Sequence, residues 1–168
     1  KQVLNIAPTD TLQIKFKYND YFTKDIDDND NFRFVQDSVN NQMIYSNNVH
    51  LEILKTDEAA PFLKIEKTAR GKSFQEAKKR AEKIQYGFQL IGNRLILDNY
   101  LLSNLSDKFR DQDVTVYLYL PDGFLFKADS SVKHYDESDN DFFDLHFSSN
   151  DYIYRVGGSK IKCLNCPD

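Results

Sequence analysis

The clearest feature of the chain is an alternation of apolar and polar residues that recurs in short runs along most of its length. Such alternation has the period of a β-strand with one buried face and one face in solvent. It is strongest in residues 11–18 (TLQIKFKY) and 114–120 (VTVYLYL). Further candidate strands are residues 3–6, 32–35, 43–45, 49–53, 61–66, 88–91, 95–97, 124–128, 131–135, 142–147, 152–156 and 161–164.

One stretch departs from this alternation and predicts a helix over Ser73–Tyr86. Ser73 followed three residues later by Glu76 is a capping box, in which we expect the Glu76 carboxylate to reach back to the Ser73 amide. Glu76 and Arg80 form an i,i+4 pair of opposite charge. The apolar positions fall on one face of this helix: Ala77, Ala81, Ile84 and Phe88. Two alanines in that stripe indicate close packing against a flat surface, which we take to be a sheet.

The connections between strands carry turn chemistry. Gly92–Asn93 separates two candidate strands by two residues, as in a tight hairpin. Pro121–Gly123 (PDG) is a turn in which glycine supplies a positive φ. Residues 99–113 are irregular, with one short helical turn expected around 105–109. Many short strands at regular spacing predict a mainly β fold, an irregular β-solenoid or a β-sandwich, with the one amphipathic helix packed on it.

Length and charge limit the function classes. At 168 residues the chain fits a single β-rich domain, with a possible N-terminal sub-lobe over residues 1–46. The formal net charge of −4 lacks the basic footprint that nucleic acid requires, so we expect no nucleic-acid partner. No apolar run is long enough to span a bilayer. Because the chain begins at Lys1 rather than methionine, we expect a fragment of a longer membrane protein whose membrane segment lies upstream.

Two acidic segments are candidates for calcium binding, Asp25–Asn31 and Asp136–Asp141. Asp27, Asn29 and Asn31 have the alternate spacing of calcium ligands. The segment lacks the glycine at the sixth position of an EF-hand loop, and Ser38 stands where the twelfth-position glutamate would be. We therefore interpret both segments as solvated turns, and we expect no metal and no cofactor.

No pattern typical of an active site is present in the sequence, so we expect no enzyme. His50, His134 and His146 are scattered, without the spacing of a metal site, and we interpret them as surface or core-edge residues. The run Gly157–Lys160 (GGSK) departs from the nucleophile pattern of hydrolases.

Cys163 and Cys166 form a C-x-x-C motif close to the end of the chain. A redox enzyme places this motif at the start of a helix after a strand, and no helix can follow here because Pro167 and Asp168 end the sequence. A structural zinc site needs a second pair of ligands, which the sequence does not offer. A disulfide and an inert reduced pair are the two readings that remain.

Three segments together resemble a known family. They are residues 68–100 (TARGKSFQEAKKRAEKIQYGFQLIGNRLILDNY), residues 108–123 (KFRDQDVTVYLYLPDG) and the terminal CLNC. This combination resembles the C-terminal region of phage-shock protein C family members of Gram-negative bacteria, in which a phage-shock domain and transmembrane helices precede a β-rich domain. The order of elements is also similar to adhesin-head domains of the β-solenoid type. The likeness covers residues 49–123 and, more loosely, the tail. Its motifs are structural, so they identify no site residues.

The resemblance implies a non-enzymatic interaction or sensor domain of a membrane-anchored envelope-stress regulator, with a protein of the cell envelope as its partner. It places the domain on the periplasmic or extracellular side of a bacterial membrane. An adhesin-like or scaffolding domain that binds a surface partner or a polysaccharide is the alternative. In an oxidising compartment of this kind, Cys163 and Cys166 should form a disulfide.

Overall fold

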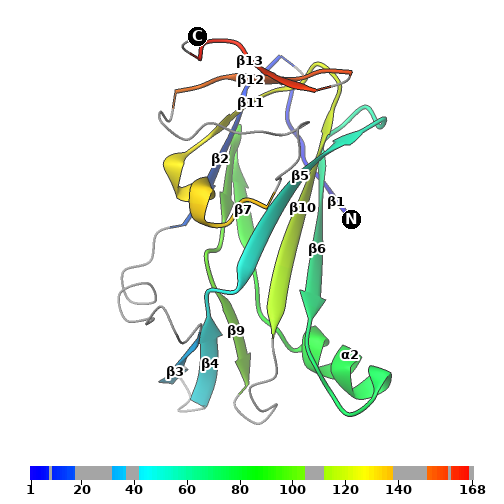
Figure 1. The fold of residues 1–168 in the computed structure, drawn as a ribbon, viewed down its shortest axis with the longest axis vertical. Coiled ribbons are helices and arrows are strands. Elements are labelled where there is room, and N and C mark those ends of the chain that lie inside the picture. The colour runs from blue at the N-terminus through cyan, green and yellow to red at the C-terminus, as the bar shows by residue number, and fades with distance from the viewer. Residues whose placement is uncertain are drawn as a thin grey trace.

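The computed structural model of the chain describes residues 1–7, 9–17, 32–36, 42–104, 112–137, 151–158 and 160–166; of residues 32–36, 42–45 and 104 it describes the backbone. Its strands assemble into three sheets, and Figure 1 shows the strands running mainly along the long axis of the molecule. The predicted mainly β architecture is therefore confirmed, and residues 1–46 contribute strands to all three sheets.

The first sheet has four strands in the order β1-β6-β10-β5. Its central strand is the most strongly alternating run of the sequence, which pairs in parallel with β5 and antiparallel with β6. The bounds are β1 Gln2–Val3, β5 Val49–Thr56, β6 Phe62–Thr68 and β10 Asp113–Pro121.

The second sheet has six strands in the order β13-β12-β11-β2-β8-β7. Its middle strand, β2, lies parallel to both neighbours, although one of them is more than one hundred residues away along the chain. The bounds are β2 Leu12–Phe16, β7 Phe88–Ile91, β8 Arg94–Leu97, β11 Leu125–Ala128, β12 Tyr154–Val156 and β13 Ile161–Cys163.

The third sheet is small, with three antiparallel strands at the lower end of the molecule in Figure 1. It consists of β3 (Phe32–Gln36), β4 (Gln42–Ser46) and β9 (Leu101–Asn104). The sequence did not predict β9, because one of its inward positions is polar. Ser103 is fully buried and donates a hydrogen bond of 2.5 Å to the side-chain oxygen of Gln112, which compensates for its burial.

A single hydrophobic core joins the first two sheets, so they pack face to face in the manner of a sandwich. The inward residues of β10 and β2 form its centre, and each is less than 3% exposed: Val114, Val116, Leu118, Leu120, Leu12, Ile14 and Phe16. Alternate residues of β10 on the other side are half-buried. The period of two in the sequence is thus the period of burial in the structure.

The glycines of the two predicted turns have positive φ, as expected, but the second turn does not close a hairpin. Gly92 has φ of 61° and closes the β7–β8 hairpin, while Gly123 has φ of 81° after β10. The strand after Gly123 does not return along β10. It crosses to the second sheet, where β11 pairs with β2 and β12, so this turn links the two layers of the sandwich.

Helix α2 occupies Phe74–Glu82, a shorter span than Ser73–Tyr86. Its beginning follows the prediction, because the Ser73 hydroxyl oxygen accepts a hydrogen bond of 3.1 Å from the Glu76 amide. The Glu76 carboxylate accepts from the amide of Lys72, one residue before the expected donor, and it also pairs with Arg80. The helix ends early because the backbone of Gln85 bridges to Leu102, which requires an extended conformation.

Figure 1 places α2 beyond the lower end of β6, the strand that it contacts. None of its nine residues is fully buried, and Ala77 and Ala81 are half-buried on the side toward the domain. Gly71 lies against the helix so closely that a Cβ atom there would be 2.6 Å from the Ala77 amide nitrogen. Part of the close packing that the small residues indicate is therefore contact between α2 and the segment just before it.

One predicted strand is wrong. Residues 131–135 form no strand; Ser130–His134 is the 3₁₀ helix η2 instead. The reason is local, because the Asp129 side chain accepts a hydrogen bond of 2.8 Å from the Ser131 amide and starts a helical turn. The expected helical turn at 105–109 and the expected strand at 142–147 lie outside the described residues.

Candidate functional site

The structure places the sequence-predicted site residues as follows. The segment Asp25–Asn31 lies outside the described residues, and of Asp136–Asp141 only Asp136 and Glu137 are described. Among the described residues there is no group of three or more histidine, cysteine, aspartate or glutamate side chains that could hold a metal ion.

His50 holds three segments together. Its Nε2 lies 3.1 Å from the Asp113 carboxylate at the start of β10, and its Nδ1 lies 2.7 Å from the Glu137 carboxylate. The backbone of Leu51 makes two hydrogen bonds of 2.7 Å with the same segment, accepting from Glu137 and donating to Tyr135. His50 therefore links the segment after η2 to β5, the strand at the edge of the four-stranded sheet. Of the other two histidines, His134 is exposed on η2, and His146 lies outside the described residues.

Cys163 and Cys166 are joined in a disulfide, with their Cα atoms 5.7 Å apart. The intervening Asn165 anchors this loop to the preceding strand: its side chain accepts from the Ile153 amide at 2.8 Å and donates to the Asp151 carbonyl at 2.9 Å. The disulfide loop is thus attached to the six-stranded sheet, because Cys163 lies in β13 and the amide of Leu164 donates to the carbonyl of Ile153.

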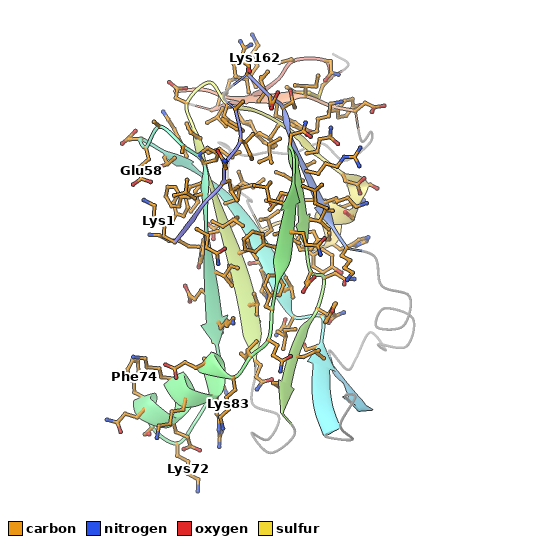
Figure 2. The ribbon with its side chains drawn as sticks, turned by 180° about the vertical axis from the view of Figure 1, so that it is seen from behind. Lys1, Glu58, Lys72, Phe74, Lys83 and Lys162 are labelled. Atoms are coloured by element: carbon orange, nitrogen blue, oxygen red, sulfur yellow. A yellow bond between two sulfur atoms is a disulfide. The ribbon has the colours of Figure 1, made fainter. Side chains whose placement is uncertain are left out.

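An aromatic surface lies on the outer face of the four-stranded sheet. The rings of Phe62 and Tyr119 are stacked, with centroids 4.5 Å apart and an interplanar angle of 13°. The Lys64 ammonium lies 5.5 Å from the centre of the Tyr119 ring, and that of Lys1 lies 4.4 Å from the centre of the Phe62 ring. These are cation–π distances. Lys1 also donates to Glu58 at 2.5 Å, and Figure 2 shows the two side by side.

Tyr117 extends this surface along β10 and lies between two carboxylates. Partial burial raises the pKa of its phenol, and the negative charges of Glu66 and Glu52 raise it further, together with a hydrogen bond to Glu66. The phenol therefore stays protonated and donates to Glu66. We call Glu52, Phe62, Lys64, Glu66, Tyr117 and Tyr119 the aromatic face.

Two hollows lie elsewhere on the molecule, away from the aromatic face. One, of about 340 Å³, lies between the end of β2 and η2 and is lined by Phe16, Asn99, Ser131, His134 and Tyr135. The other, of about 280 Å³, lies over the six-stranded sheet and mixes both charges, with Lys15, Arg94 and Lys127 against Asp129 and Asp151. The first hollow contains both Ser131 and His134, and the Ser131 hydroxyl oxygen accepts a hydrogen bond of 2.9 Å from the Phe16 amide.

A buried polar cluster lies near the first hollow. Burial raises the pKa of Asp98, while a hydrogen bond from the Gly87 amide (3.1 Å) and the positive charge of Lys17 oppose that rise. Burial, with the charge of Asp98, also raises the pKa of Tyr86 well above its usual value. The Tyr86 hydroxyl has no hydrogen-bond partner among the described residues.

Asp98 makes the stability of the fold depend on pH. Because its pKa is raised in the folded state, the folded protein binds more protons than the unfolded chain between the two pKa values, so this contribution to stability falls as the pH rises through the folded pKa. Asp98→Asn keeps an acceptor for Gly87 and removes the titration. We expect the stability of this variant, relative to wild type, to increase from mildly acidic to neutral pH. Urea unfolding across that range measures the trend, and a pH-independent difference would contradict it.

Sequence reasoning did not identify the aromatic face. The alternation in VTVYLYL places Tyr117 and Tyr119 on the solvent side of a strand, and that was the available signal. It did not show that Phe62 and Glu66 lie beside them, because the pairing of β6 with β10 joins positions about fifty residues apart.

These features define a mainly β domain built from three sheets. A family model described as a toast-rack domain found in some PspC proteins, at their C-terminus, matches residues 35–168. The chain belongs to this family, which confirms the resemblance to the C-terminal β-rich region of phage-shock protein C. Comparisons with the curated proteins and with the solved structures gave no match. In the described part of the chain, no helix combines the length and the apolar character needed to cross a membrane.

Proposed function

We propose that this toast-rack domain is a non-enzymatic protein-interaction domain of a membrane-anchored, phage-shock-type regulator, and that it acts on the extracytoplasmic side of a bacterial membrane. Its family supports the association with PspC proteins. The aromatic face is the observation that carries the interaction role. It is the surface that contacts an envelope protein.

The composition and setting of this face support that role. Tyrosine is enriched at the centres of protein interfaces because its ring buries a large area at low cost in side-chain entropy. Tyr117 and Tyr119 are half-buried on β10, which is hydrogen-bonded on both sides along most of its length and backed by the core. Such a strand holds the rings in one position before a partner arrives.

The disulfide between Cys163 and Cys166 supports the location, because structural disulfides persist mainly in oxidising compartments. We expect an impermeant maleimide to label these cysteines in the full-length protein only after reduction, in cells whose outer membrane alone has been permeabilised. Labelling that needs lysis of the inner membrane but no reductant would place the domain in the cytoplasm and refute the location.

Site-specific crosslinking tests the contact itself. A photo-crosslinking amino acid at Lys64, on the aromatic face, should give a protein adduct in cells, and Tyr119→Ser should abolish it. The same probe at Lys162, an exposed residue of β13 at the far end of the domain from α2 (Figure 2), is the control. Equal adducts from both positions, or no effect of Tyr119→Ser, would contradict an interface at this face.

A surface polysaccharide is the second candidate partner, because the half-buried tyrosine rings of this face, which lie beside carboxylates, can also stack on sugar rings. The same experiment separates the two candidates. A protein adduct is resistant to glycosidases, whereas a polysaccharide adduct at Lys64 would be removed by them.

A further inference from the structure

Among the described residues, the most exposed large apolar side chain lies near one end of the molecule. Phe74, the first residue of α2, is 83% exposed, more than Val3, Ile91 or Leu164. Figure 2 shows Phe74 near the lower end of the long axis, at the opposite end of the domain from Lys162. This ring contributes little to the core of the domain, so it is available for contact with a surface outside the chain.

The residues around Phe74 are strongly basic in a chain that is acidic. Residues 70–83 contain six lysines and arginines against two glutamates, whereas the whole chain has a net charge of −4. Glu76 is engaged by Arg80, which leaves Glu82 as the other acid of the segment. Lys72, Lys78 and Lys79 are exposed and have no ion-pair partner among the described residues.

These side chains share the outward side of the helix. In α2 the half-buried residues are Glu76, Ala77, Arg80 and Ala81, and the exposed residues include Phe74, Lys78 and Lys79. Phe74 and Lys78 are four residues apart and therefore neighbours on the helix surface. The alanines of the predicted apolar stripe thus lie on the half-buried side, while the exposed side carries Phe74 with two lysines, Gln75 and Glu82.

We call Lys72, Phe74, Lys78 and Lys79 the α2 tip. Contacts of the chain around it hold it in a fixed position. Arg80 donates to the Arg70 carbonyl at 3.0 Å, and Ser73 caps the first turn, so the approach to the helix and the helix itself form one unit. The buried Ile84 follows directly after the helix. Phe74 is consequently presented in a defined position instead of on a loose arm.

From these contacts we propose that α2 docks the domain onto an anionic lipid surface, with Phe74 inserted at the headgroup level and Lys72, Lys78 and Lys79 over the lipid phosphates. An anionic lipid surface complements the excess of lysine and arginine in residues 70–83, and it can take up a single exposed ring without a preformed groove. Aromatic rings with lysines around them are typical of interfacial membrane contacts. This surface is separate from the aromatic face.

Vesicle binding by the purified 168-residue chain tests this proposal. The chain should co-sediment with vesicles of phosphatidylglycerol and phosphatidylcholine, and not with phosphatidylcholine alone. Lys78→Gln with Lys79→Gln should weaken binding by about twenty-fivefold, since each lysine near an anionic surface contributes about fivefold. Phe74→Ser should weaken it by about tenfold, as expected for loss of a largely buried ring.

Matched variants control for folding and for general electrostatic attraction. Ile91→Ser, at a residue 59% exposed in β7, and Lys162→Gln should leave vesicle binding unchanged. Equal binding to neutral and anionic vesicles, absence of binding to both, or equal losses at Lys162 and Lys78 would each overturn the proposal. Because this test uses the isolated chain, its failure is independent of the labelling and crosslinking results for the proposed function.

Discussion

Replacing Phe126 with alanine should lower the free energy of unfolding by about 3–5 kcal/mol, the cost of removing a phenyl ring from a core that cannot fully collapse. Phe126 is fully buried in β11, and its ring stacks on that of Tyr154 with centroids 5.2 Å apart. Its strand is paired on one side with β2 and on the other with β12. The cavity would therefore open where the N-terminal and C-terminal parts of the chain meet.

Phe74→Ala is the matched control, because it removes the same ring from a position that is 83% exposed. It should change the stability by no more than about 0.5 kcal/mol. Urea unfolding followed by circular dichroism measures both variants, and an unchanged m-value would show that the denatured state is not altered. A loss at Phe126 below about 1 kcal/mol would mean that the layers around β11 are not tightly packed.

Gly71→Ala should destabilise the protein by about 1–3 kcal/mol, although alanine is a conservative change in most loops. The new Cβ atom would lie 2.6 Å from the amide nitrogen of Ala77 and 3.0 Å from the carbonyl carbon of Glu76. Both are backbone atoms of the first helical turn, so no side-chain rotation can relieve the overlap. The helix or its approach has to move, and this change also disturbs the position of Phe74.

Gly158→Ala provides the comparison, since a Cβ atom there meets nothing within 4 Å. Its effect on the free energy of unfolding should stay within about 0.5 kcal/mol. If Gly71→Ala were equally well tolerated, the close approach of residue 71 to the helix would not exist in solution. Because the lipid contact depends on a fixed α2, Gly71→Ala should also weaken vesicle binding, whereas Gly158→Ala should not.

The two proposed surfaces have different requirements that follow from their shapes. The aromatic face is broad, lies on a sheet and combines tyrosine rings with charged residues of both signs, as a protein interface requires. The α2 tip is basic and has a single aromatic ring, which suits contact with an anionic lipid surface. A domain with both surfaces could lie against the membrane with its tip while the aromatic face stays free for a partner.

What the sequence determined by itself is local structure. The period of two in β2 and β10 identified strands and their buried sides, Ser73 located the start of α2, and Gly92 identified a two-residue hairpin. Each of these depends on interactions within a few residues: side-chain alternation, a cap on the next amides, or a positive φ at glycine. A local interaction also explains one wrong prediction. Asp129 caps a helical turn at Ser131, where the sequence predicted a strand, and the segment forms η2.

Only the tertiary structure decided which segments meet. Leu12 pairs with Phe126 and Val49 with Val114, both across parallel strands, and nothing within either strand encodes its partner because backbone hydrogen bonds are the same for every residue. Ser103 can lie in a buried strand because Gln112, nine residues later in the chain, accepts its hydrogen bond, and the polarity of Ser103 concealed the alternation. The aromatic face and the exposed Phe74 have the same origin. Whether a ring is covered depends on what the rest of the chain places over it, and that is settled by packing between elements far apart in the sequence.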